Sequence, residues 1–96
     1  MSSGPKFVTR VHMAPDGYRH EHIDEIEYHH GFDSEPQYAT ISVMALLIDD
    51  HGWEVLVTGA PEHVRLQTVQ PYGRPAYLRA FADTVPTNDL LDVPRY

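Results

Sequence analysis

The sequence contains no cysteine and no hydrophobic run long enough to cross a bilayer. Without thiols the chain can form neither a disulfide nor a thiolate nucleophile, which suits a reducing compartment. The longest apolar run covers residues 43–48, whereas a transmembrane helix needs about 20 apolar residues. The first residues also lack the apolar segment of a secretory signal. These absences predict a cytoplasmic protein with no membrane partner.

Basic residues are missing from the middle of the chain. Between Arg19 and Arg65 the sequence contains neither Lys nor Arg, while ten acidic residues lie there and the net charge of the whole chain is −7. An acidic field of this kind repels phosphate backbones, so we expect no nucleic acid partner. A basic protein surface is the partner that this charge favours.

Motifs that would support an enzyme are missing as well. No serine or threonine has the setting for nucleophilic catalysis, which is a sharp glycine-flanked turn beside a histidine and an oriented acid. The sequence also has no glycine-rich loop of the kind that holds phosphate. We therefore expect a non-enzymatic protein with no catalytic residues and no cofactor.

The residues that are present favour one small folded domain. With 96 residues, of which 42% are hydrophobic, the chain can bury a core, and residues 1–5 are expected to form a loose lead-in. Residues 7–13 alternate between two faces and predict a half-buried strand. Residues 14–17 predict a turn, because Pro15 presets the backbone and Asp16 accepts backbone hydrogen bonds.

The partner strand of this hairpin is predicted over residues 18–28. Ile23 and Ile26 are three residues apart and therefore out of phase for a regular strand, so we expect a bulge near Asp24 that restores the phase. A short helix is the competing interpretation of this segment.

A helix is predicted over residues 40–52, with Thr40 as its N-cap and Gly52 as its end. Three further alternating segments, residues 53–58, 64–70 and 76–83, predict strands. The whole pattern predicts an α+β fold, in which a small antiparallel sheet of about five strands carries one helix on a face, in the order ββαβββ.

The last residues carry more apolar surface than a free tail would. Residues 87–91 predict one helical turn, and we expect Leu90, Leu91 and Val93 to pack on the core. Tyr77-Leu78-Arg79, Ala82-Asp83 and residues 88–95 resemble the ending of a family of short bacterial and phage proteins of unknown function. The resemblance implies a fold but no activity, and it suggests a phage product that binds a host protein.

The seven histidines raise the alternative of a metal site. On a strand His20 and His22 would project to the same side, and either His12 on the paired strand or Asp24 could complete the set of ligands. The competing interpretation is that these are ordinary surface histidines beside acids. A His/Asp metal-binding protein, with hydrolysis as its activity, is therefore the alternative function. Because the surrounding carboxylates favour the imidazolium, we also expect raised histidine pKa values, except where burial opposes the charge, and a stability that increases from about pH 8 to about pH 6.

Aromatic residues near the end of the chain supply a candidate partner-binding patch. Its members are Tyr72, Tyr77, Arg79, Phe81 and Tyr96. Aromatic and arginine side chains are favoured at interfaces, although the same residues could instead form the core side of the sheet. Because one helix covers only part of a sheet face, the remaining apolar surface predicts protein–protein contact, most simply in a homodimer.

Overall fold

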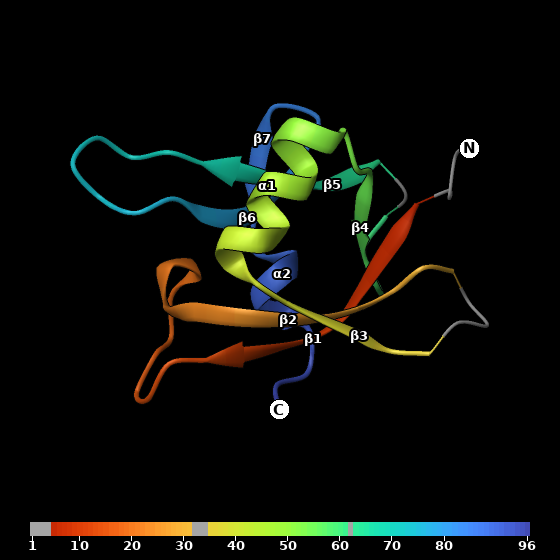
Figure 1. Cartoon of the computed structure of the whole chain (residues 1–96), viewed down its shortest axis with the longest axis horizontal. Coiled ribbons are helices and arrows are strands. Elements are labelled where there is room, and N and C mark those ends of the chain that lie inside the picture. The colour runs from red at the N-terminus through yellow and green to blue at the C-terminus, as the bar shows by residue number, and fades with distance from the viewer. Residues whose placement is uncertain (1–4, 32–34, 62) are drawn as a thin grey trace.

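The computed structural model of the chain describes residues 5–31, 35–61 and 63–96, and these form one seven-stranded mixed sheet with one main helix (Figure 1). The strands lie in the order β3–β2–β1–β4–β5–β6–β7. They are β1 (Lys6–Met13), β2 (Ile23–His29), β3 (Gln37–Thr40), β4 (Val55–Val57), β5 (Val64–Val69), β6 (Tyr77–Ala82) and β7 (Val85–Thr87). The helical elements are η1 (His20–His22), α1 (Ile41–His51) and α2 (Asp89–Asp92). Of the predicted lead-in, residues 1–4 lie outside the described residues.

The predicted α+β class and the helix packed on the sheet are confirmed, but the sheet is larger than expected and not wholly antiparallel. β4 pairs with β1 in parallel, and β3 and β7 were not predicted. β3 is short and runs directly into α1, so its four residues carry little alternation of their own. β7 contains Pro86, which is tolerated because this strand lies at the edge of the sheet. The strands predicted at 53–58, 64–70 and 76–83 are β4, β5 and β6 with shorter ends.

Two bulges set which side chains of the β1–β2 hairpin face the core. Asp24 is the extra residue between the pairs His12–Glu25 and Met13–Ile23, which confirms the predicted bulge. A second bulge at Thr9 was not predicted. It changes the phase of β1, so that Val8 and Val11, three residues apart, are both fully buried.

The hairpin turn is confirmed, with Gly17 N donating to Ala14 O over 2.8 Å. Its positive φ falls on Asp16, and Gly17 is needed for a different reason. A Cβ at Gly17 would lie 2.5 Å from His22 Cβ, so no larger residue fits. The predicted strand from residue 18 is wrong in its first part, since residues 20–22 form a 3-10 turn and β2 begins at Ile23.

α1 covers one face of the sheet and has the predicted ends. Thr40 caps it by accepting a hydrogen bond from Val43 N, and Gly52 ends it in the left-handed region with φ 66°. Met44 is fully buried against the sheet, and Ile48 packs on the same core. No helix among residues 5–31, 35–61 and 63–96 is long and apolar enough to cross a membrane.

The predicted packing of the last residues is also confirmed. Leu90 is fully buried and Val93 nearly so, and both belong to the same core as Val11 and Met44. α2 lies between the β1–β2–β3 half and the β5–β6–β7 half of the sheet, behind α1 in Figure 1, and contacts β1 and β6. Residues beyond α2 then reach the side of β1 that β4 leaves open after Val8.

Candidate interaction face

Cross-strand pairing places a row of side chains across the sheet face that points away from α1. Phe7 on β1 is opposite Leu56 on β4, Leu56 is opposite Arg65 on β5, and Phe81 on β6 is opposite both Arg65 and Pro86. Directly opposed residues point to the same face of a sheet. We call these five residues, Phe7, Leu56, Arg65, Phe81 and Pro86, the outer row.

The outer row is partly exposed, whereas its sequence neighbours face the core. The first four members are half-buried and Pro86 is exposed, but Val64, Leu66 and Ala80 on the other face are buried. Beside the row lies a hollow of about 290 Å³. Its walls are formed by Phe7, Thr9, His29, Gly31 and residues 56–61. The outer row is therefore largely apolar, with Arg65 as its one charged side chain.

The predicted partner residues do not form one patch. Tyr77, Arg79 and Phe81 share this outer face of β6, since Leu78 and Ala80 between them are buried. Arg79 is partly engaged, because its Nε donates to Thr87 O and its terminal nitrogen to Asn88 Oδ1, both over 3.2 Å. Tyr72 is fully exposed in the turn between β5 and β6.

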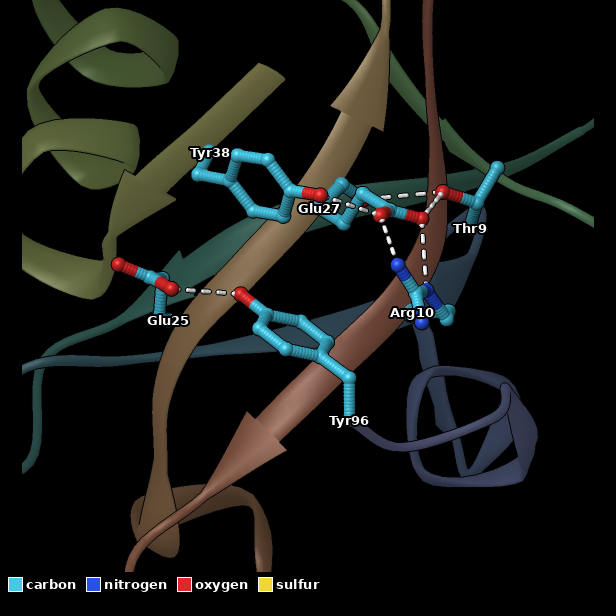
Figure 2. A network of polar contacts seen from close by, with 6 residues as sticks. All are labelled: Thr9, Arg10, Glu25, Glu27, Tyr38 and Tyr96. Carbon is cyan, nitrogen blue, oxygen red and sulfur yellow. Dashed lines mark hydrogen bonds and ion pairs between the residues drawn. The ribbon is translucent and has the colours of Figure 1, made fainter. Parts of the chain in front are cut away.

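Tyr96, the fifth predicted residue, lies on the outer face of β1, β2 and β3 (Figure 2). Its hydroxyl donates to Glu25 Oε1 over 2.7 Å. Its ring centroid is 5.4 Å from that of His12 and 5.7 Å from that of Tyr38, and the Arg10 guanidinium carbon is 5.1 Å away. Burial, followed by the hydrogen bond to Glu25, raises the pKa of Tyr96 well above its ordinary value, so the phenol stays a donor at neutral pH.

Beside Tyr96, the carboxylate of Glu27 is buried on the same face and fully engaged (Figure 2). It accepts hydrogen bonds from Thr9 Oγ1 over 2.7 Å, from Arg10 Nε over 2.9 Å and from the Tyr38 hydroxyl over 2.9 Å. A second Arg10 nitrogen completes a bidentate ion pair. The hydrogen bond from Arg10 is the main cause that holds the pKa of Glu27 down at about 2.

Sequence reasoning named Phe81 and Tyr96 but missed the residues that surround them on this face. Phe7, Leu56 and Arg65 come together only because β1 and β4 pair in parallel, and Arg10 meets Glu27 only through the bulge at Thr9. The signal available in the sequence was the alternation of apolar and polar residues along each strand. This pattern shows which residues share a face of one strand, but not which strands are neighbours.

The residues of the alternative metal set have separate roles. His20 is buried in η1, and Tyr18 N and Arg19 N donate to His22 Nδ1. Asp24 Oδ1 lies 2.6 Å from His12 Nδ1 in an exposed pair. In the part of the chain that the structure describes, no group of three or more His, Cys, Asp or Glu side chains is arranged to hold a metal ion.

Comparison of the chain with protein-family models, with curated proteins and with solved structures gives no match. The resemblance of the last residues to a family of short bacterial and phage proteins therefore stays a prediction, and function has to be argued from the geometry of the face.

Proposed function

We propose that this protein is a non-enzymatic protein–protein interaction domain that self-associates through the outer row, most simply as a dimer. The observation that carries the proposal is the row itself, in which Phe7, Leu56 and Phe81 lie half-buried across three strands. α1 packs on the opposite face of the sheet, where it contacts β2, β3, β5 and β6. Aromatic and aliphatic side chains with an arginine among them are the composition favoured at the centre of interfaces.

A second copy is the occupant that fits this face most simply. Two sheets pack face to face at about 10 Å, and a two-fold axis through the row would bring each Phe81 against the partner's apolar side chains. Arg65 is held at the face by Glu54 Oε1, 3.1 Å from its terminal nitrogen, so the charge on this part of the face is balanced. The remaining charge of each copy repels the other, because the net charge is −7.

The electrostatics make the association depend on salt in a defined direction. Screening weakens repulsion between two acidic copies, whereas apolar contact is little affected by moderate salt. Self-association should therefore strengthen between low salt and physiological salt. A heterologous partner, such as a host protein bound by a phage product, is the competing version, and a basic partner would show the opposite salt dependence.

Chemical-shift mapping during dilution tests the proposal. Amide resonances of β4, β5 and β6 should change with protein concentration, and they should change more at physiological than at low salt. Resonances of α1 serve as the internal control, because this helix covers the opposite face of the sheet. Concentration-dependent shifts confined to α1, or none at millimolar protein, would reject self-association through the outer row.

A further inference from the structure

Residues 94–96 run alongside β1 and form an isolated β-bridge with it. Val11 N donates to Pro94 O over 3.0 Å, and Tyr96 N donates to Val11 O over 3.1 Å. The resulting bridge between Val11 and Arg95 is parallel, as is the pairing of β4 with Lys6–Val8 on the same side of β1. The chain thus adds an extended segment to a strand side that β4 leaves open, which is the geometry by which many domains bind extended peptides.

The side chain of Tyr96 anchors this segment. Its ring lies among the side chains of Arg10, His12 and Tyr38, and its hydroxyl donates to Glu25 (Figure 2). A hollow of about 370 Å³ adjoins the anchor and is lined by His12, Asp24, Glu25 and Thr40. The site therefore offers three kinds of contact. The backbone N–H and carbonyl of Val11 can pair with an extended segment, the rings of His12 and Tyr38 can pack on an aromatic side chain, and the Glu25 carboxylate can accept a hydrogen bond from a phenol.

The segment can leave without opening the core. Leu90 and Val93 are buried and hold α2 in place, whereas Pro94 and Arg95 are exposed and Tyr96 keeps 36% of its surface accessible to solvent. Two backbone hydrogen bonds, the hydrogen bond from the Tyr96 hydroxyl and the contacts of its ring hold the three residues against β1. Because a hydrogen bond contributes only about 0.5–1.5 kcal/mol net, an incoming strand with the same groups can compete for the site.

We propose that this part of β1 is a peptide-binding site, which residues 94–96 occupy in cis and which takes an extended, basic, tyrosine-bearing segment of a partner protein. The segment seated there, Pro94-Arg95-Tyr96, shows the chemistry that the site accepts. The preference for a basic segment follows from charge, because Asp24 and Glu25 line the hollow and the positive charge of Arg10 is engaged by Glu27.

This inference is independent of self-association through the outer row, since it concerns one side of β1 and the anchor around Tyr96 rather than the faces of β4, β5 and β6. A monomeric protein could still bind the peptide, and a dimer could fail to bind it. The two proposals can therefore fail separately.

The test uses the full chain with Tyr96→Ala and a synthetic peptide of sequence Val-Pro-Arg-Tyr, followed by amide chemical shifts. Without the Tyr96 side chain, the chain should bind the peptide roughly tenfold more tightly than the wild-type chain does. The reason is that residues 94–96 of the wild type compete with the peptide for β1 at an effective concentration in the millimolar range. The shifts should centre on Arg10, Val11 and Glu25. The control peptide Val-Pro-Arg-Ala should bind at least about tenfold more weakly, because it lacks the aromatic anchor.

A second pair of variants separates binding from folding. In the Tyr96→Ala background, Glu25→Gln should weaken binding of the tyrosine peptide. Glu54→Gln, a change of the same kind away from the site, should leave the affinity for this peptide unchanged. If Tyr96→Ala does not fold, the two peptides are compared on the wild-type chain at higher peptide concentration, where the peptide has to displace residues 94–96. Equal binding of the tyrosine and alanine peptides, or no shift at Val11 at millimolar peptide, would overturn the proposal.

Discussion

The hydroxyl of Tyr96 donates a hydrogen bond to Glu25 across a separation of 71 residues in the sequence. This contact ties the end of the chain to the central strand of the β1–β2–β3 half, on the same outer face where Glu27 is buried between Arg10 and Tyr38. The face opposite α1 thus has two parts: an engaged polar network at β1–β3, and the half-buried outer row from β1 to β7.

Replacing Tyr96 with Phe measures the hydrogen bond alone. The ring should keep its contacts with Arg10 and His12, while Glu25 loses a donor but can turn to water, because it is only partly buried. We expect a loss of about 0.5–1.5 kcal/mol in the free energy of unfolding, read from urea denaturation. Tyr72→Phe is the matched control, since that side chain is fully exposed, and it should change stability by less than about 0.5 kcal/mol.

The buried carboxylate of Glu27 predicts an acid-sensitive stability. Its pKa is lowered to about 2 in the folded chain from an ordinary value of 4.5. A lowered folded pKa means that the unfolded chain takes up the proton first, so this contribution is complete above about pH 4.5 and is lost as the pH falls towards 2. Glu27→Gln should cost about 1–3 kcal/mol at neutral pH, because Arg10 loses its charged partner.

Thermal melts of the wild type and Glu27→Gln between pH 7 and pH 2 should therefore converge on acidification. A difference in melting temperature that stayed constant over this range would show that Glu27 titrates normally in the folded protein. Glu54→Gln, at the half-exposed pair with Arg65, serves as the control and should show a much smaller effect.

At His20 burial opposes the effect that neighbouring acids were expected to have on the histidine pKa values. Desolvation by burial, and then the positive charge of Arg79, lower its pKa, against a smaller opposite effect from Glu21. Moreover, within the described residues its Nε2 has no hydrogen-bond partner. Because the folded pKa lies below the unfolded value of about 6.5, the stability that neutral His20 provides is lost as the pH falls below that value.

His20→Leu should remove this pH dependence. The melting temperature of the wild type should fall relative to that of the variant as the pH is lowered from about 7 to about 5. A wild-type protein that gained stability relative to His20→Leu over this range would mean that the imidazolium is favoured in the folded state. Titration of the His20 ring by NMR gives the direct check.

The core position of the last helix can be tested with neighbouring leucines. Leu90 is fully buried, so Leu90→Ala should lower the free energy of unfolding by about 2–5 kcal/mol. Leu91 is only partly buried, and Leu91→Ala should cost less. Deletion of residues 88–96 should abolish folding, because it removes Leu90 and Val93 from the core together. Comparable effects of the two alanine variants would place α2 outside the core.

The sequence predicted local structure well wherever a residue acts on its own neighbours. Thr40 and Gly52 set the ends of α1, and the phase of Ile23 and Ile26 required the bulge at Asp24. These features depend on capping, left-handed backbone and side-chain alternation, all of which are visible within a few residues.

The sequence could not predict the features that depend on which strands are neighbours. The parallel pairing of β1 with β4 places Phe7 beside Leu56, and the bulge at Thr9 places Arg10 beside Glu27. Tyr96 was expected near Tyr77 because both are close to the chain end, but the chain crosses behind α1 through α2 and reaches β1 instead. Long-range register is set by the packing of the whole core, not by local propensity.

Sedimentation velocity of the wild-type chain and of Phe81→Glu at physiological salt tests the central claim most directly. The wild type should sediment as a dimer or larger species at micromolar concentration, and Phe81→Glu should be monomeric, because a carboxylate would be buried in the middle of the interface. Leu46→Glu, a matched change at an exposed position on α1, should sediment like the wild type. A wild-type protein that is monomeric throughout, or a Phe81→Glu variant that still dimerises, would contradict self-association through the outer row.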